Sequence, residues 1–187
     1  MENNNIFSDR MPTLLKRSNL PVELQKVNPE YLKPSIRTIC ENIRSFQSGS
    51  IFLGGPRKGK STSAAAIMLN YLNMHRYKHL VDDVGYYVSG YVLCRNSHIM
   101  DKFNKSESEF MVETMNRIKN TKCLIVDNIF SNMTSLDAML FNSIYDERQY
   151  CGGLTIYVSQ TADPLECASS PLYRIARDAI HKELFTC

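Results

Sequence analysis

Apolar residues in this chain fall into short continuous runs and into longer segments with helical spacing. Three such runs lie within residues 51–53, 122–128 and 154–159, and glycine or polar residues bound each of them. Short apolar runs without alternation are typical of strands buried on both faces of a sheet. In the segments between them, apolar residues recur every three or four positions, which predicts helices that pack on the sheet.

The alternation of these two patterns predicts an α/β fold, with a parallel sheet covered by helices on both faces. A segment rich in tyrosine and valine at 85–94 predicts a further strand, which Gly90 can interrupt. Residues 1–32 are expected to be an N-terminal arm and linker, loosely ordered up to about residue 18, and residues 33–187 to be the folded domain. The expected helices cover residues 33–46, 62–75, 97–103, 106–119, 134–150 and 170–187.

Composition limits the classes of protein to which this chain can belong. With 187 residues, 43% of them hydrophobic and 22% charged, it is long enough for one well-buried globular domain. A net charge of +3 is too small to predict nucleic-acid binding by itself. No apolar run approaches the ~20 residues of a membrane span, and the first residues lack the apolar core of a signal peptide. We therefore expect a cytoplasmic protein that does not enter a membrane.

The first apolar run leads into the segment GGPRKGKS at residues 54–61, which fits the pattern G-x-x-x-x-G-K-[ST]. Glycines let backbone N–H groups curl around phosphate oxygens, and the N-terminus of the following helix adds positive potential. In this pattern Lys60 reaches the β- and γ-phosphates and the Ser61 hydroxyl binds Mg²⁺. A chance glycine turn is the alternative, but strand, loop and helix stand in the required order. The residues expected to bind ATP are Gly54, Gly55, Pro56, Arg57, Lys58, Gly59, Lys60, Ser61 and Thr62.

The second run, KCLIVDN at residues 122–128, carries Asp127 at its end. Ligands of open α/β sheets bind at the carboxyl edge of the strands, so we expect this carboxylate to hold Mg²⁺ opposite Ser61. An aspartate that only caps a buried strand is the alternative, and the phosphate loop upstream favours the metal role. The third run is followed by Gln160. A phosphate loop, an acid-tipped strand and a polar-tipped strand, in this order, predict a P-loop ATPase core.

Beyond these motifs, the chain resembles the AAA+ helicase loaders of bacteria and their phages, the DnaC and DnaI type, to which the insertion-sequence ATPase IstB is related. The resemblance runs from about Leu20 to Ile180. The stretches that carry it, besides the phosphate loop, read NLPVELQKVNPEYLKP, GYYVSGYVLCRNSHIMDKF, TKCLIVDNIF, YDERQYCGGLTIYVSQ and PLYRIARDAI. In order, they are similar to the segment before the ATPase core, the second strand with its helix, the Walker B strand, the arginine-containing helix with the sensor-1 strand, and the closing segment with an arginine finger.

This resemblance implies a RecA-like AAA+ core, ATP and Mg²⁺ as cofactors, contact with single-stranded DNA, and escort of a ring-shaped replicative helicase onto DNA. Lys60 and Ser61 then match the nucleotide lysine and the metal hydroxyl, and Asp127 matches the Walker B aspartate. Gln160 matches a polar sensor that contacts the γ-phosphate or the attacking water. Arg174 matches a finger that contacts a neighbouring subunit's nucleotide, which implies self-assembly or a partner ATPase.

The chain also departs from the pattern of these loaders. Asn128 follows the Walker B aspartate, where active members carry glutamate, and an amide is a far poorer proton acceptor than a carboxylate. We therefore expect slow hydrolysis, with ATP binding as the working state. A separate helicase-binding domain is not expected before the ATPase core, nor a helical lid after it. Arg177 is the candidate for a sensor-2 arginine.

Other functions remain open on the sequence. An IstB-like regulator of transposition would polymerise on duplex DNA and meet a transposase. A nucleotide-sensing adaptor or inhibitor of replication would hold ATP without turnover, and Asn128 favours it. A small nucleotide kinase is compatible with the phosphate loop, but the chain has no convincing acceptor site or arginine-rich lid.

Overall fold

The computed structural model describes residues 9–77, 83–100, 105–130, 132–161 and 170–185. Its centre is a sheet of five strands in the spatial order β2-β3-β4-β1-β5, and every pairing is parallel. The inner strands β1, β3 and β4 are buried along almost their whole length, because helices cover both faces. The strands are β1 (Gly49–Gly54), β2 (Gly85–Ser89), β3 (Cys123–Ile129), β4 (Leu154–Ser159) and β5 (His181–Leu184).

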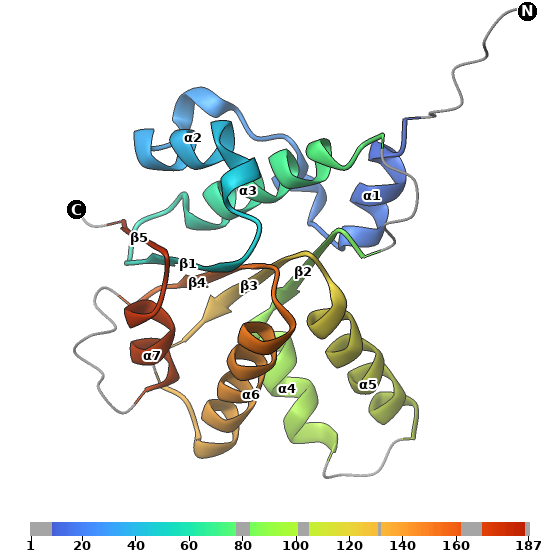
Figure 1. The fold of residues 1–187 in the computed structure, drawn as a ribbon. Helices are drawn as coiled ribbons and strands as arrows, with labels where there is room; N and C mark the ends of the chain where they lie inside the picture. The colour runs from blue at the N-terminus through green and yellow to red at the C-terminus, as the bar shows by residue number, and fades with distance from the viewer. Residues whose placement is uncertain (1–8, 78–82, 101–104, 131, 162–169, 186–187) are drawn as a thin grey trace, which may run out of the picture.

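Helices form one layer on each face of the sheet (Figure 1). Successive residues of β1 point to opposite layers, so Ile51 and Leu53 belong to one hydrophobic cluster and Phe52 to the other. The predicted α/β fold with both faces covered is thus confirmed. The first layer holds α1 (Met11–Ser18), α2 (Pro34–Glu41) and α3 (Lys60–Met74), and the second holds α4 (Gly90–Met100), α5 (Lys105–Asn120), α6 (Ser135–Cys151) and α7 (Pro171–Arg177).

The segment before α2 takes part in the core, although the sequence predicted a loosely ordered arm up to residue 18. Residues 11–18 form helix α1, which contacts β2 and α3 and buries Leu14. Leu20 and Leu32 are buried in the same cluster. Between them the chain forms the short 3-10 helices η1 (Val22–Gln25) and η2 (Pro29–Tyr31), and η3 (Ile43–Ser45) follows α2. The division of the chain at residue 33 remains a prediction.

The expected strand at 85–94 is wrong in its second half. Strand β2 ends at Ser89, and α4 begins at Gly90 rather than at Ser97. A Cβ atom on Gly90 would lie 3.1 Å from the ring of Phe141 and 3.2 Å from the carbonyl oxygen of Asp127. A side chain at this position would be crowded by Phe141 and the end of β3, which favours glycine there, and the local sequence does not reveal this packing.

The expected helix over 170–187 is also wrong in its second half. Helix α7 ends at Arg177, and residues 181–184 form β5, which pairs with β1 from Ile51 to Gly54. The β5 segment is only partly buried at every position. A strand of this kind has a weak pattern of its own and is specified by the neighbour with which it pairs. None of the helices in the described part of the chain combines the length and apolar character needed to span a membrane.

A buried guanidinium joins α6 to the beginnings of β3 and β4. Arg148 is 3% exposed, and its nitrogens donate to Thr155 Oγ1 at 2.9 Å and to main-chain carbonyls at 2.6 to 3.3 Å. Burial lowers the pKa of Arg148. Two of the carbonyls are in the last turn of α5, where the helix itself provides no donor. The accepting carbonyls are those of Ile118, Lys119, Thr121 and Leu154.

Replacing Arg148 with methionine should lower the free energy of unfolding by about 3 kcal/mol, because buried acceptors lose their donor. Urea unfolding followed by circular dichroism measures the change. Arg44→Met, at an exposed arginine, is the matched control and should change stability by less than about 0.5 kcal/mol. Equal unfolding midpoints for the two variants would contradict the structural role of Arg148.

Candidate functional site

The phosphate loop and the ends of β3 and β4 surround a cavity of about 450 Å³. Because β1, β3 and β4 are parallel neighbours, their carboxyl ends meet at one edge of the sheet. Helix α3, which follows β1, packs on one face of the sheet, whereas α7, the helix after β4, packs on the other. The chain therefore leaves the neighbouring strands β1 and β4 toward opposite faces, and the cavity opens at that point. The lining residues are Pro56, Arg57, Lys58, Gly59, Lys60, Ser61, Thr62, Asp127, Asn128, Val158, Ser159 and Gln160.

The predicted site residues of three separate segments are therefore neighbours in space. Lys60 and Ser61 lie at the start of α3, Asp127 and Asn128 at the end of β3, and Gln160 directly after β4. Gly54 and Gly55, the first two residues of the loop, are buried and do not line the cavity.

Two glycines determine the backbone path of the loop. Gly55 has φ +108° and Gly59 has φ +103°, a region that side-chain-bearing residues rarely adopt. A Cβ atom on Gly55 would also lie 2.5 Å from the carbonyl oxygen of Phe185. The N–H of Gly55 donates to the carbonyl of Thr161 at 2.7 Å, which ties the loop to the end of β4.

Strand β5 supports the loop from outside, through contacts that the sequence did not indicate. The N–H of Phe185 donates to Gly54 O at 2.8 Å, and the N–H of Arg57 donates to Phe185 O at 3.1 Å. Lys33, just before α2, donates to Glu183 Oε1 at 2.6 Å, and its Nζ lies 4.4 Å from the centre of the Phe185 ring. Phe185 thus holds the phosphate loop directly, and Lys33 in turn holds the segment around Phe185.

Lys60 supplies a buried ammonium group at the floor of the cavity. The residue is 7% exposed, and its Nζ donates to the carbonyl of Arg57 at 2.5 Å. Burial lowers the pKa of Lys60, and the nearby Asp127 carboxylate opposes that shift. No acidic side chain in the described ranges forms an ion pair with Lys60. A buried cation in this condition favours an anionic ligand.

Asp127 is held at both of its oxygens. It is 2% exposed; its Oδ1 accepts the N–H of Asn128 at 2.7 Å, and its Oδ2 accepts the hydroxyl of Tyr87 at 2.9 Å. Burial, together with the Asp127 carboxylate, raises the pKa of Tyr87, so the hydroxyl stays protonated and donates. Sequence reasoning missed Tyr87, because only the pairing of β2 with β3 brings it beside Asp127.

Asn128 occupies a β-bulge. Val126 pairs with Tyr157 and Ile129 pairs with Ser159, so two residues of β3 stand opposite one residue of β4. The backbone of Asn128 has φ +57°, in the left-handed region that asparagine tolerates better than most residues. The left-handed backbone at this position therefore favours asparagine, independently of any chemical role of its side chain.

The donor set fits Mg²⁺ bound together with phosphate. Ser61 and Asp127 are the residues that could hold the ion, one through a hydroxyl and one through a carboxylate. Within the ranges that the structure describes, no group of three or more His, Cys, Asp or Glu side chains could form a metal cage. Mg²⁺ typically keeps several waters and uses one or two carboxylates plus substrate phosphates, which matches this sparse set.

Arg174 does not reach the cavity. On α7, it forms an ion pair with Asp146 of α6 at 2.8 Å, and its guanidinium carbon lies 4.7 Å from the centre of the Tyr145 ring. Arg177 pairs with Asp178 at 2.6 Å and does not line the cavity either. Contact of Arg174 with a neighbouring subunit's nucleotide remains a prediction.

Comparison with known proteins gives the fold a context. Searches of protein-family models and of curated proteins find no match to this chain. Among solved structures, the DnaC helicase loader is similar with a TM-score of 0.60 and 17% identity, over 89% of this chain and 99% of that one. DnaI is similar with a TM-score of 0.60 and 16% identity, over 88% of this chain and 93% of that one. The chain therefore has the same fold as the DnaC and DnaI helicase loaders.

The same fold occurs in an initiator. AMPPCP-bound DnaA from Aquifex aeolicus is similar with a TM-score of 0.57 and 14% identity, over 89% of this chain and 51% of that one. At these identities the likenesses establish the fold, and they confirm at that level the resemblance seen in the sequence. In this fold, the phosphate loop and the acid-tipped strand β3 lie on either side of β4, and Gln160 directly follows β4.

Proposed function

We propose that this protein binds ATP with Mg²⁺ in the cavity between the phosphate loop and Asp127, and that it loads or remodels a replicative DNA helicase in the cytoplasm of a bacterial cell. The observation that carries the binding proposal is the convergence of Lys60, Ser61, Asp127 and Gln160 around one cavity. The likeness to DnaC and DnaI supports the helicase as partner, and the AMPPCP in the DnaA structure supports an adenine nucleotide as ligand.

Each side chain then has a defined task. Lys60 offsets the charge of the β- and γ-phosphates, and Ser61 and Asp127 hold the metal ion, which neutralises phosphate charge when bound. The backbone N–H groups from residue 58 to residue 62 cradle the phosphates, since Pro56 has no N–H and the N–H of Arg57 already donates to Phe185. The Gln160 amide contacts the γ-phosphate or orients the attacking water.

Arg174 has a task only in an assembly. It would reach the nucleotide of a neighbouring copy, or of a partner ATPase, after leaving its ion pair with Asp146. The pair is solvent-exposed on both sides, and exposed ion pairs contribute about 0–1 kcal/mol, so its release costs little.

Replacing Lys60 with alanine should weaken ATP binding by roughly 10- to 100-fold, because charge-assisted hydrogen bonds to phosphate are lost. A titration with a fluorescent ATP analogue measures this change. Lys26→Ala, at an exposed lysine outside the cavity, serves as the control and should bind as the wild type does. Unchanged affinity in the Lys60 variant would refute the proposed site.

DNA binding should be weak and dominated by phosphate contacts, since the net charge is only +3. A DnaA structure with AMPPCP and single-stranded DNA supports single strands as the form bound. Fluorescence anisotropy with labelled oligonucleotides should show a preference for single strands and a steep loss of affinity with salt. A preference for duplex DNA would instead favour an IstB-like regulator of transposition.

A nucleotide-sensing adaptor without turnover is the second candidate function. The observation that favours it is Asn128, an amide at the position next to Asp127 where active helicase loaders carry glutamate. In this alternative, ATP binding changes the affinity for a replication protein, and the nucleotide leaves unhydrolysed.

Changing Asn128 to glutamate should raise the hydrolysis rate at least about tenfold, because general-base assistance typically contributes ~10²–10⁴-fold and the left-handed backbone removes part of that gain. Release of phosphate at saturating ATP measures the rate. Asn128→Gly is the matched control, since it relaxes the backbone at φ +57° without adding a base. If both variants turn over at the wild-type rate, residue 128 has a conformational role only.

A further inference from the structure

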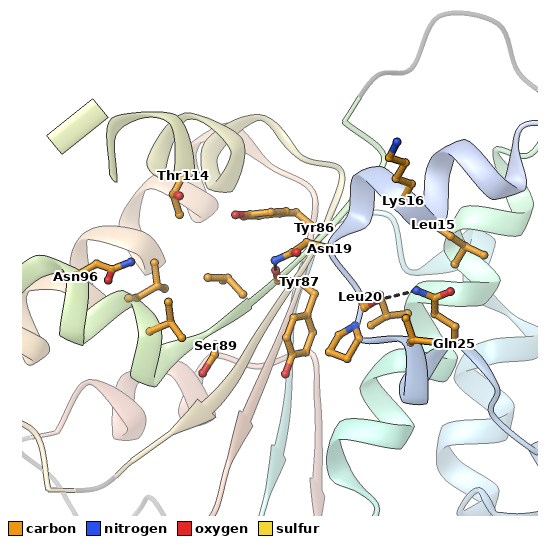
Figure 2. A pocket seen from close by; sticks show the side chains of 15 residues that line it. Leu15, Lys16, Asn19, Leu20, Gln25, Tyr86, Tyr87, Ser89, Asn96 and Thr114 are labelled. Carbon is orange, nitrogen blue, oxygen red and sulfur yellow. Dashed lines mark hydrogen bonds between the residues drawn. The ribbon is translucent and has the colours of Figure 1, made fainter. Parts of the chain in front are cut away.

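A second cavity, also of about 450 Å³, lies at the β2 edge of the sheet (Figure 2). The N-terminal segment contributes Lys16, Asn19 and Gln25 to its wall, and α4 and α5 contribute Asn96 and Thr114. Figure 2 shows these side chains on both sides of strand β2, which runs between them. Both tyrosines of β2 also line this cavity.

Tyr87 connects the wall of this second cavity with the candidate ATP site. Tyr87 lines the second cavity, while its hydroxyl donates to Asp127 Oδ2 at 2.9 Å. Its main-chain carbonyl accepts the side-chain amide of Asn19 at 3.2 Å. Asn19 of the N-terminal segment thus holds the backbone of Tyr87, and the side chain of Tyr87 extends from β2 to the Asp127 carboxylate.

We propose that Tyr87 is a positioning residue that orients the Asp127 carboxylate for the metal ion, an inference that rests on the proposed function. The N–H of Asn128 holds Oδ1 and the Tyr87 hydroxyl holds Oδ2, so the carboxylate cannot rotate freely about its Cβ–Cγ bond. A carboxylate that is already oriented loses less entropy when it binds a cation. Hydrogen-bonding partners of metal ligands typically contribute 10–100-fold to metal affinity.

The neighbouring residue provides a matched control. Tyr86 lies on the same strand and is 6% exposed, and the Arg117 guanidinium carbon lies 4.1 Å from the centre of its ring. It pairs in register with Leu124, whereas Tyr87 pairs with Ile125. Removing the hydroxyl of either tyrosine changes the protein by one oxygen atom, but only Tyr87→Phe removes a hydrogen bond to Asp127.

The test measures binding of a fluorescent ATP analogue over a series of MgCl₂ concentrations and, separately, in EDTA. Tyr87→Phe should need about tenfold more Mg²⁺ for half of the metal-dependent gain in affinity, and its affinity in EDTA should equal that of the wild type. Tyr86→Phe should match the wild type in both conditions. Asp127→Asn should lose most of the metal dependence.

The outcomes separate this inference from the function on which it rests. If the wild type gains no affinity from Mg²⁺, the proposed metal site and this inference both fail. If Asp127→Asn loses the metal dependence while Tyr87→Phe keeps it, only the role of Tyr87 is refuted. A Tyr87→Phe variant that loses equal affinity in EDTA and in MgCl₂ would reduce Tyr87 to a structural residue, and would also overturn the inference.

Discussion

The parallel pairing of β1 with β4, and of β4 with β3, is the constraint on which the candidate site depends. Leu53 pairs with Val158 and Val126 with Tyr157, so the three strands end together at one edge of the sheet. Residues that are about 70 and 30 positions apart in the chain thereby line one cavity. A shift of one residue in either pairing would reverse the direction of every side chain on the shifted strand and separate Lys60 from Asp127.

Main-chain hydrogen bonds anchor the phosphate loop on two sides. Thr161 holds it from the end of β4 and Phe185 from the end of β5. Lys33 in turn holds the Phe185 segment. N–H groups that are oriented in this way reduce the entropy cost of binding an anion such as the proposed phosphate. The buried ammonium of Lys60 adds charge to the same place.

The end of β3 shows how sheet geometry and chemistry are combined. The bulge at Asn128 lets its N–H reach Asp127 Oδ1, and the neighbouring strand delivers the Tyr87 hydroxyl to Oδ2. Asn128 suits the left-handed backbone of the bulge, whereas a glutamate there would be strained. The bulge therefore favours asparagine at residue 128, and the same asparagine is the reason that we expect slow hydrolysis.

The sequence by itself determined what depends on neighbouring residues. The glycine pattern specified the loop at 54–61, and the apolar runs specified β1, β3 and β4, because strand and helix periods are local properties. The order of these motifs was enough to predict the α/β fold and to place Asp127 opposite Ser61, whereas the place of Gln160 came from the resemblance to the helicase loaders.

Only the tertiary structure decided what depends on pairing between distant segments. Strand β5 has no distinguishing pattern of its own and forms because it pairs with β1, and α1 is stabilised by packing on β2 and α3. Gly90, the first residue of α4, is crowded by Phe141 and the end of β3, which favours glycine there. The roles of Tyr87 and Arg148 likewise follow from partners that are 40 and up to 30 residues away in the chain. Such partners are chosen by the register of the whole sheet and by burial, and no local window of the sequence contains that information.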